Sequence, residues 1–173
     1  MGLLRNRQAE PVAGSRYQMR QRLLSIGDDY WIEDENGSRA FHVDGKALRV
    51  RKTFVLQDAT GREVAKLQER KLSIRDKMEI ERDGRRLATV KKALVGIRDR
   101  FAIDIDGGAD MDAKGNLVDH EYEIVRDGDT VATVSKRWFA VRDTYGVAIA
   151  PAQDDALILA ITVCIDALAH PRD

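Results

Sequence analysis

The last stretch of the sequence, from Asp154 to His170, most strongly constrains what this chain can fold into. Two acids, Asp154 and Asp155, stand where a helix would be capped, and neither Gly nor Pro follows them until Pro171. Acids in the first turn and a proline just past the last turn are the start and stop signals of a helix. The sequence therefore predicts a helix over residues 154–170.

This predicted helix is apolar on almost every side, so it must be surrounded by lipid or by the rest of the protein. A membrane span needs about 20 apolar residues to cross roughly 30 Å of hydrocarbon. The apolar stretch here is only about 15 residues, or about 22 Å, and Asp166 lies inside it. We therefore expect it to be the centre of the protein core rather than a transmembrane segment. Its broadest apolar face, the predicted helix core, consists of Leu157, Ile158, Ile161, Ile165 and Leu168.

The composition indicates a single domain with no strong overall charge. The chain has 173 residues, of which 43% are hydrophobic, and this is enough to bury a core. Its 29 basic and 29 acidic residues cancel, so nucleic acid is not an expected partner. The single cysteine, Cys164, lies inside the predicted helix, which fits a reducing, cytoplasmic compartment. Residues 1–15 are polar, resemble no signal peptide, and are expected to form a flexible leader.

Short β-rich segments separated by turn signals fill the chain between the leader and the helix. Residues 30–32 and 40–43 flank an Asn-Gly pair and predict a hairpin. Three later segments repeat one pattern, in which a strand is followed by an Asp/Gly turn and an aliphatic-Ala-polar-aliphatic strand. These segments are residues 54–67, 78–92 and 122–136.

The remaining segments are less regular. From Tyr17 onward, the first ten residues fit either a strand or a short helix. Residues 107–116 are rich in Gly and Asp, and we expect them to be a long, mobile connection between two strands. Residues 138–141 and 145–149 are expected to form the last strands before the helix.

About a dozen short strands and one helix indicate either an antiparallel sandwich or a barrel. A two-layer sandwich has no place for a helix that is apolar on every side, whereas a closed sheet can enclose one. We therefore predict a mainly β fold, a closed antiparallel barrel of about twelve strands. It would form one domain over residues 16–170, with helix 154–170 in its bore.

Several short motifs occur along the chain in a characteristic order. They are Tyr17-Gln-Met19, Asp29-Tyr-Trp-Ile32, Phe41-His-Val-Asp-Gly-Lys46, Lys71-Leu-Ser-Ile74, Gly115-Asn116, His120-Glu-Tyr122, Val134-Ser-Lys-Arg-Trp-Phe139, Asp143-Thr-Tyr-Gly-Val147 and the closing helix. In their order and spacing these motifs resemble the LURP-one-related family, whose relatives include the tubby carboxy-terminal domain and the phospholipid scramblases. The resemblance covers about residues 17–169. It implies a tubby-like barrel of twelve strands closed around a central C-terminal helix.

The resemblance implies less about function than about fold. Because the titratable groups are scattered along the sequence and the predicted helix takes up the bore, we expect a non-enzymatic binding module. Tubby domains bind phosphoinositides through basic residues, and scramblases act on membranes. The palmitoylated cysteine cluster of the scramblases has no counterpart here, because Cys164 is alone. An anionic membrane lipid headgroup or a protein is therefore the expected partner.

A short basic run offers a candidate anion-binding site. Arg49 and Arg51 lie on one face of a predicted strand, with Lys46 and Lys52 nearby. Planar guanidinium groups suit the geometry of a phosphate. The alternative is that these cations form a solvated outer face of the barrel.

The sequence contains no recognisable catalytic or cofactor motif. Its histidines, His42, His120 and His170, have none of the spacings typical of metal ligands, and we expect no metal and no cofactor. His120 is expected to be a hydrogen-bonded structural residue. The alternative function is an enzyme with an acid/base site at a barrel mouth around His120 and Glu121.

Overall fold

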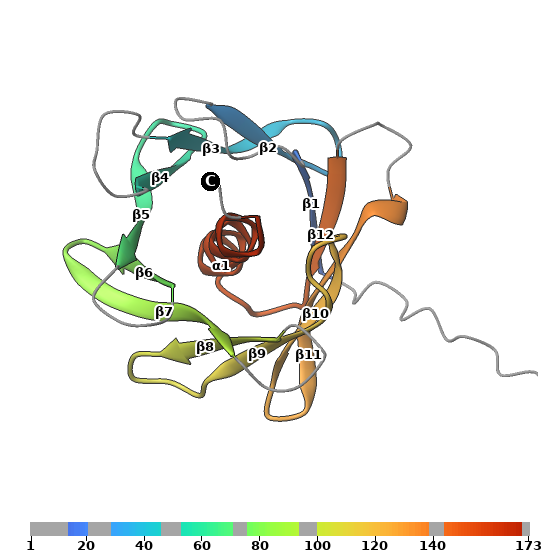
Figure 1. Ribbon diagram of the computed structural model, residues 1–173. Coiled ribbons are helices and arrows are strands. Elements are labelled where there is room, and N and C mark those ends of the chain that lie inside the picture. Colours follow the sequence, from blue (N-terminus) through green and yellow to red (C-terminus); the bar gives the residue numbers. More distant parts are fainter. Residues whose placement is uncertain are drawn as a thin grey trace, which may run out of the picture.

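The C-terminal helix lies inside a closed ring of antiparallel strands, as a computed structural model shows (Figure 1). The structure describes residues 14–20, 29–45, 53–70, 76–93, 100–138 and 144–170. Within these ranges twelve strands form the ring, and β1 (Ser15–Arg20) closes it by pairing with β12 (Thr144–Ile149). The predicted closed antiparallel barrel around a helix is confirmed.

Every other strand pairs with its neighbours in chain order, so the barrel is a series of hairpins. The strands between the first and the last are β2 (Tyr30–Asp34), β3 (Arg39–Gly45), β4 (Thr53–Asp58), β5 (Glu63–Arg70), β6 (Lys77–Arg82), β7 (Arg85–Ala93), β8 (Arg100–Ile105), β9 (Met111–Asn116), β10 (Glu121–Arg126) and β11 (Asp129–Ser135). A short 3-10 helix, η1 (Lys136–Trp138), follows β11, and the helix α1 (Asp155–Ala169) follows β12.

The three sequence repeats form the hairpins β4–β5, β6–β7 and β10–β11, and each has a register shift close to its turn. Two of them turn through an Asp-Gly pair, at Asp83-Gly84 and Asp127-Gly128. All four residues have positive φ, from 51° to 85°. Two-residue hairpin turns of type I′ need positive φ at both central positions, which explains the Asp-Gly pairs.

The two ends of the barrel differ in how they are built. At the end where α1 begins, which we call the turn end, tight turns join β2 to β3, β4 to β5, β6 to β7 and β10 to β11. At the opposite end, which we call the loop end, the short turn of residues 117–120 joins β9 to β10. The described strand ends that flank residues 21–28, 46–52, 71–75, 94–99 and 139–143 also lie at the loop end, and those residues themselves are outside the described part of the chain.

The core is formed by α1 and the inward-facing side chains of the strands. Every residue of α1 from Ile158 to Ala167 is buried, including Leu159 and Val163 on the side opposite the broad apolar face. Of the predicted helix-core residues, Ile158, Ile161 and Ile165 are buried, while Leu157 and Leu168 are partly buried and pack against the core. In the described part of the chain, no helix has the length and hydropathy needed to cross a membrane.

The structure corrects the prediction of a long connection over residues 107–116. Residues 111–116 form β9, which pairs with β8 and β10. Met111 and Ala113 on this strand face the core, and Asp112 forms an ion pair with Arg100 of β8 at 2.6 Å. Cross-strand pairing therefore outweighs the low strand propensity of its Asp, Lys and Gly residues.

Smaller differences between the sequence predictions and the structure occur at the first strand and after β11. Residues 17–20 of the segment that begins at Tyr17 lie in a strand, β1, which starts one residue inside the expected leader at Ser15, and the rest of that segment lies outside the described residues. Residues 1–13 of that leader lie outside the described residues. Trp138, expected in a strand, lies in η1, and the rest of that expected strand also falls outside the described ranges.

The start of α1 is held by the walls of the barrel on two sides. Asp154 caps the helix by accepting a hydrogen bond from the Leu157 amide at 3.1 Å. The same carboxylate accepts from the guanidinium of Arg82, on β6, at 2.8 and 3.2 Å. On another strand, Tyr17 donates its hydroxyl hydrogen to Asp155 at 2.6 Å. These contacts fix where the helix enters the bore.

We predict that Ile161→Asp unfolds the whole domain, because it places an unpaired charge in a fully buried position. Ile161→Val is the matched control and should cost only about 0.5–1.5 kcal/mol of unfolding free energy. Circular dichroism and thermal unfolding measure both. A folded Ile161→Asp protein with little loss of thermal stability would contradict the enclosed helix.

The helix cap should make stability depend on pH. Burial alone raises the pKa of Asp154, but the hydrogen bonds from Arg82 and the Leu157 amide and the Arg82 charge outweigh it and lower the pKa. A lowered pKa in the folded state stabilises the fold above the unfolded pKa of about 3.9, and this contribution is lost as the pH falls through the folded pKa. Urea unfolding should therefore show wild type more stable than Asp154→Asn at about pH 7, with the difference shrinking towards about pH 3. A difference that does not change with pH would contradict the ion pair.

Candidate functional site

A buried polar cluster lies in the bore near the last turns of α1. Its centre is the carboxylate of Asp166, whose residue is only 1% exposed. One carboxylate oxygen accepts the hydroxyl hydrogen of Tyr145, on β12, at 2.6 Å. The other lies 2.5 Å from Nε2 of His120, which is fully buried. The only acid in the buried part of α1 is thus hydrogen bonded to groups from the barrel wall, as a buried carboxylate requires.

The backbone of the β9–β10 turn directs His120 into the bore. His120 is the last residue of this turn and has a φ of 54°, which an L-residue adopts only rarely. The turn is held by Asn116, whose side chain accepts from the Asp119 amide at 3.1 Å and donates to the Asp119 carboxylate at 2.7 Å. The His120 ring also stacks on the ring of Tyr145, with 4.2 Å between centroids.

His170 joins the end of α1 to the same turn. It is the C-cap residue of the helix, and its Nδ1 lies 3.2 Å from the carbonyl oxygen of Asp166. Its Nε2 lies 3.1 Å from the carbonyl oxygen of Val118. The rings of His170 and His120 are nearly parallel, 14° apart, with centroids separated by 5.5 Å. The loop end thus holds two histidines beside one carboxylate.

Three tyrosines surround Asp166, and all three remain neutral. Burial raises the pKa of Tyr30, Tyr122 and Tyr145 well above the ordinary value, and the negative charge of Asp166 raises each of them further. Tyr145 uses its hydroxyl on Asp166, and the Tyr122 hydroxyl lies near that of Thr162 without hydrogen-bond geometry. Among the described residues, the Tyr30 hydroxyl and Nδ1 of His120 have no hydrogen-bond partner.

The structure does not bring His120 and Glu121 together as an acid/base pair. The His120 side chain points into the bore, whereas the Glu121 carboxylate accepts from the Ser135 hydroxyl at 2.9 Å and from the Lys136 amide at 3.1 Å. These two hydrogen bonds hold the Glu121 carboxylate at the end of the adjacent strand, β11. The two side chains have separate partners, so this geometry does not support the alternative of a catalytic site built on them.

The candidate anion-binding residues Lys46, Arg49, Arg51 and Lys52 lie outside the described residues. They belong to the connection between Gly45, the end of β3, and Thr53, the start of β4. Gly45 and Thr53, which flank these residues, lie at the loop end of the barrel, as does the buried polar cluster.

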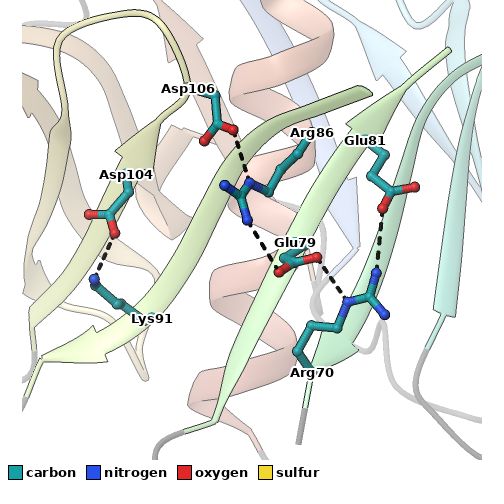
Figure 2. Close-up of polar contacts among 7 residues, drawn as sticks. All are labelled: Arg70, Glu79, Glu81, Arg86, Lys91, Asp104 and Asp106. Carbon is teal, nitrogen blue, oxygen red and sulfur yellow. Dashed lines mark hydrogen bonds and ion pairs between the residues drawn. The ribbon is translucent and has the colours of Figure 1, made fainter. Parts of the chain in front are cut away.

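Basic residues on the outer face of β5 to β8 are paired with acids on neighbouring strands (Figure 2). Arg70 donates to Glu79 at 2.8 Å, and Arg86 donates to Asp106 at 2.9 Å. Lys91, on the same strand as Arg86, donates to Asp104 of β8 at 2.6 Å. Because each of these three cations has an acidic partner, none of them is available to bind an anion without breaking an ion pair.

The hollow at the turn end also lacks a free cation. Arg82 in its wall forms an ion pair with Asp154. The Arg82 Nε also donates a hydrogen bond to the carbonyl oxygen of Val64, at a distance of 2.8 Å. The residues that line this hollow are Arg62, Glu63, Val64, Arg82, Asp83 and Ala156.

Cys164 is not a candidate nucleophile, because burial raises the pKa of its thiol well above the ordinary value.

The different roles of two tyrosines in the cluster give a matched pair of variants. Tyr145→Phe removes a donor from the buried Asp166 carboxylate and should cost about 1.5–3 kcal/mol of unfolding free energy. Tyr30→Phe removes a hydroxyl that has no partner among the described residues, so it should change stability by less than about 0.5 kcal/mol. Urea unfolding of both variants tests this difference. Equal losses would mean that Tyr145 does not stabilise Asp166.

Comparisons with known proteins identify the fold and the family. An X-ray structure of a protein from Arabidopsis thaliana is similar, with a TM-score of 0.66 and 20% sequence identity. The match covers 90% of this chain and 92% of that chain. No curated protein matches the sequence. The family model described as LURP-one-related matches residues 15–166, which include all twelve strands of the barrel and most of α1. The chain therefore belongs to the LURP-one-related family.

Proposed function

We propose that this protein is a non-enzymatic binding module whose function resides on its outer surface at the loop end. The observation that carries this proposal is that the bore is filled. The residues of α1 from Ile158 to Ala167 are all buried, and so are His120 and Asp166, the titratable groups that converge there. A catalytic site needs converging titratable groups that a substrate can reach in a concave pocket. The filled bore therefore favours binding over catalysis.

The ligand class that we propose is an anionic membrane lipid headgroup carrying phosphate. The basic run of Lys46, Arg49, Arg51 and Lys52 supplies two guanidinium groups, which bind phosphate oxygens in pairs. The arginines and the lysine of β5 to β8 that are drawn in Figure 2, Arg70, Arg86 and Lys91, are less suitable, because they are already paired with acids. The net charge of zero means that binding must rest on a local group of cations rather than on the field of the whole molecule.

A cytoplasmic location is part of the same proposal. It fits the single cysteine, which is buried in α1 and so needs no oxidising compartment. It would also place the basic run beside the leaflet that is rich in anionic lipids.

Sedimentation with lipid vesicles tests the proposed function. We expect binding to vesicles that contain phosphoinositide, none to neutral vesicles, and weaker binding as the salt concentration rises. The double variant Arg49→Ala with Arg51→Ala should lose most of this binding. The charge-matched control is Arg62→Ala with Arg85→Ala, which removes two exposed cations at the opposite, turn end of the barrel and should keep this binding.

The controls decide between a specific site and general charge attraction. Equal losses in both double variants would contradict a site at Arg49 and Arg51. No binding to anionic vesicles at low salt would contradict the lipid proposal as a whole, and a protein partner would then be the remaining candidate for a binding module.

A further inference from the structure

The end of α1 brings together three side chains that commonly bind metal ions. His120 comes from the β9–β10 turn, and Asp166 and His170 come from the last turn and the C-cap of the helix. Each offers one ligand atom, and the three atoms all lie within 4.8 Å of one another. We propose that His120, Asp166 and His170 form a binding site for a divalent transition metal ion of the zinc class.

The donor set selects the class of ion. Two imidazole nitrogens and one carboxylate oxygen are ligands that Zn²⁺ and its neighbours in the first transition row accept. Ca²⁺ and Mg²⁺ prefer sites built from oxygen atoms, so two histidines disfavour them. Three protein ligands leave a fourth position of a tetrahedral ion for water or another small ligand.

Small movements would bring the three atoms to ligand geometry. With bonds of about 2.1 Å, neighbouring ligands of a tetrahedral ion are about 3.4 Å apart. His120 Nε2 and Asp166 Oδ1, 2.5 Å apart, would have to separate by about 1 Å as the ion replaces the hydrogen between them. His170 would have to approach by up to about 1.4 Å, the difference between 4.8 Å and about 3.4 Å. It is a partly exposed residue at the end of the helix, so this movement disturbs no core packing.

The groups around the three ligands are those that orient metal ligands in proteins. Tyr145 donates to the second oxygen of Asp166 at 2.6 Å, which leaves the first oxygen for the ion. His170 has a carbonyl oxygen beside each ring nitrogen, at 3.1 and 3.2 Å. A neutral imidazole donates from one nitrogen only, so His170 can donate to one carbonyl and coordinate through its other nitrogen.

A second observation points to the same place. His120 Nδ1 and the Tyr30 hydroxyl are buried and have no hydrogen-bond partner among the described residues. Buried polar atoms nearly always have a partner, and an ion or an ordered water commonly supplies it. Tyr30 is the first residue of β2, so it lies at the loop end of the barrel, as do Asp166 and His170.

Metal titration of the purified full chain, stripped of metal with a chelator, tests the site. We expect one Zn²⁺ per chain by isothermal titration calorimetry, and a visible absorption band of tetrahedral Co²⁺ that Zn²⁺ removes. Bound Zn²⁺ should also raise the thermal midpoint of unfolding, because it binds the folded state.

Three variants locate the ion. His170→Ala removes a ligand at the end of the helix, where the fold tolerates a change, and should weaken binding by more than the roughly 10–100-fold typical of losing an orienting group. Tyr145→Phe removes such an orienting group and should weaken binding by roughly 10–100-fold. His42→Ala is the matched control. His42 hydrogen bonds to Gln57 on the outer face, so its loss should leave the binding of one ion per chain unchanged.

Near-UV circular dichroism should confirm that each variant is folded before it is titrated. Absence of saturable binding of Zn²⁺ and Co²⁺ to the wild-type chain would overturn the proposal. Binding that persists at full strength in folded His170→Ala, or that disappears in His42→Ala, would overturn it as well. None of these outcomes depends on lipid binding, so the metal site and the proposed function can fail separately.

Discussion

Enclosure of a helix that has no polar face is the constraint on which the rest of this structure depends. Ten consecutive residues of α1 are buried, from Ile158 to Ala167, so apolar surface must meet the helix from every direction. A flat sheet covers one side of a helix, whereas a sheet closed on itself covers all of them. Closure also leaves no exposed strand edge. A closed sheet therefore covers the helix on every side and also leaves none of its own strand edges exposed.

Asp166 is the exception within that apolar helix, and it organises the loop end. A buried carboxylate is costly unless donors surround it. The barrel supplies Tyr145 from β12 and His120 from the β9–β10 turn. His170 then ties the helix end to that turn through Val118. The tight cap at Asp154 and this polar cluster hold the helix at its two ends, while the middle is held by packing alone. Polar chemistry is therefore concentrated at the ends of the bore.

The sequence predicted the architecture well because the relevant signals are local. Caps and an unbroken apolar run mark α1, and Asp-Gly turns mark the repeated hairpins. The strand β9 was not predicted, because only Met111 and Ala113 face inward and the strand ends in Gly and Asn. The polar cluster was not predicted either. His120 and Asp166 are 46 residues apart in the chain, and their contact depends on barrel register and on a positive φ at His120. The one available signal in the sequence was Asp166, a single acid within an apolar helix. A buried acid requires a polar partner, but the sequence does not show which residue that partner is.

The order of elements along the chain has a consequence for how the protein is made. All twelve strands precede α1, and the barrel closes only when β12, near the end of the described chain, pairs with β1. During synthesis the hairpins emerge first, and their contacts are local, so they can form early. Their inward rows of apolar side chains, however, have nothing to cover them until the helix leaves the ribosome. The growing chain therefore carries exposed apolar sheet faces through most of its translation, a state that favours aggregation and binding by chaperones.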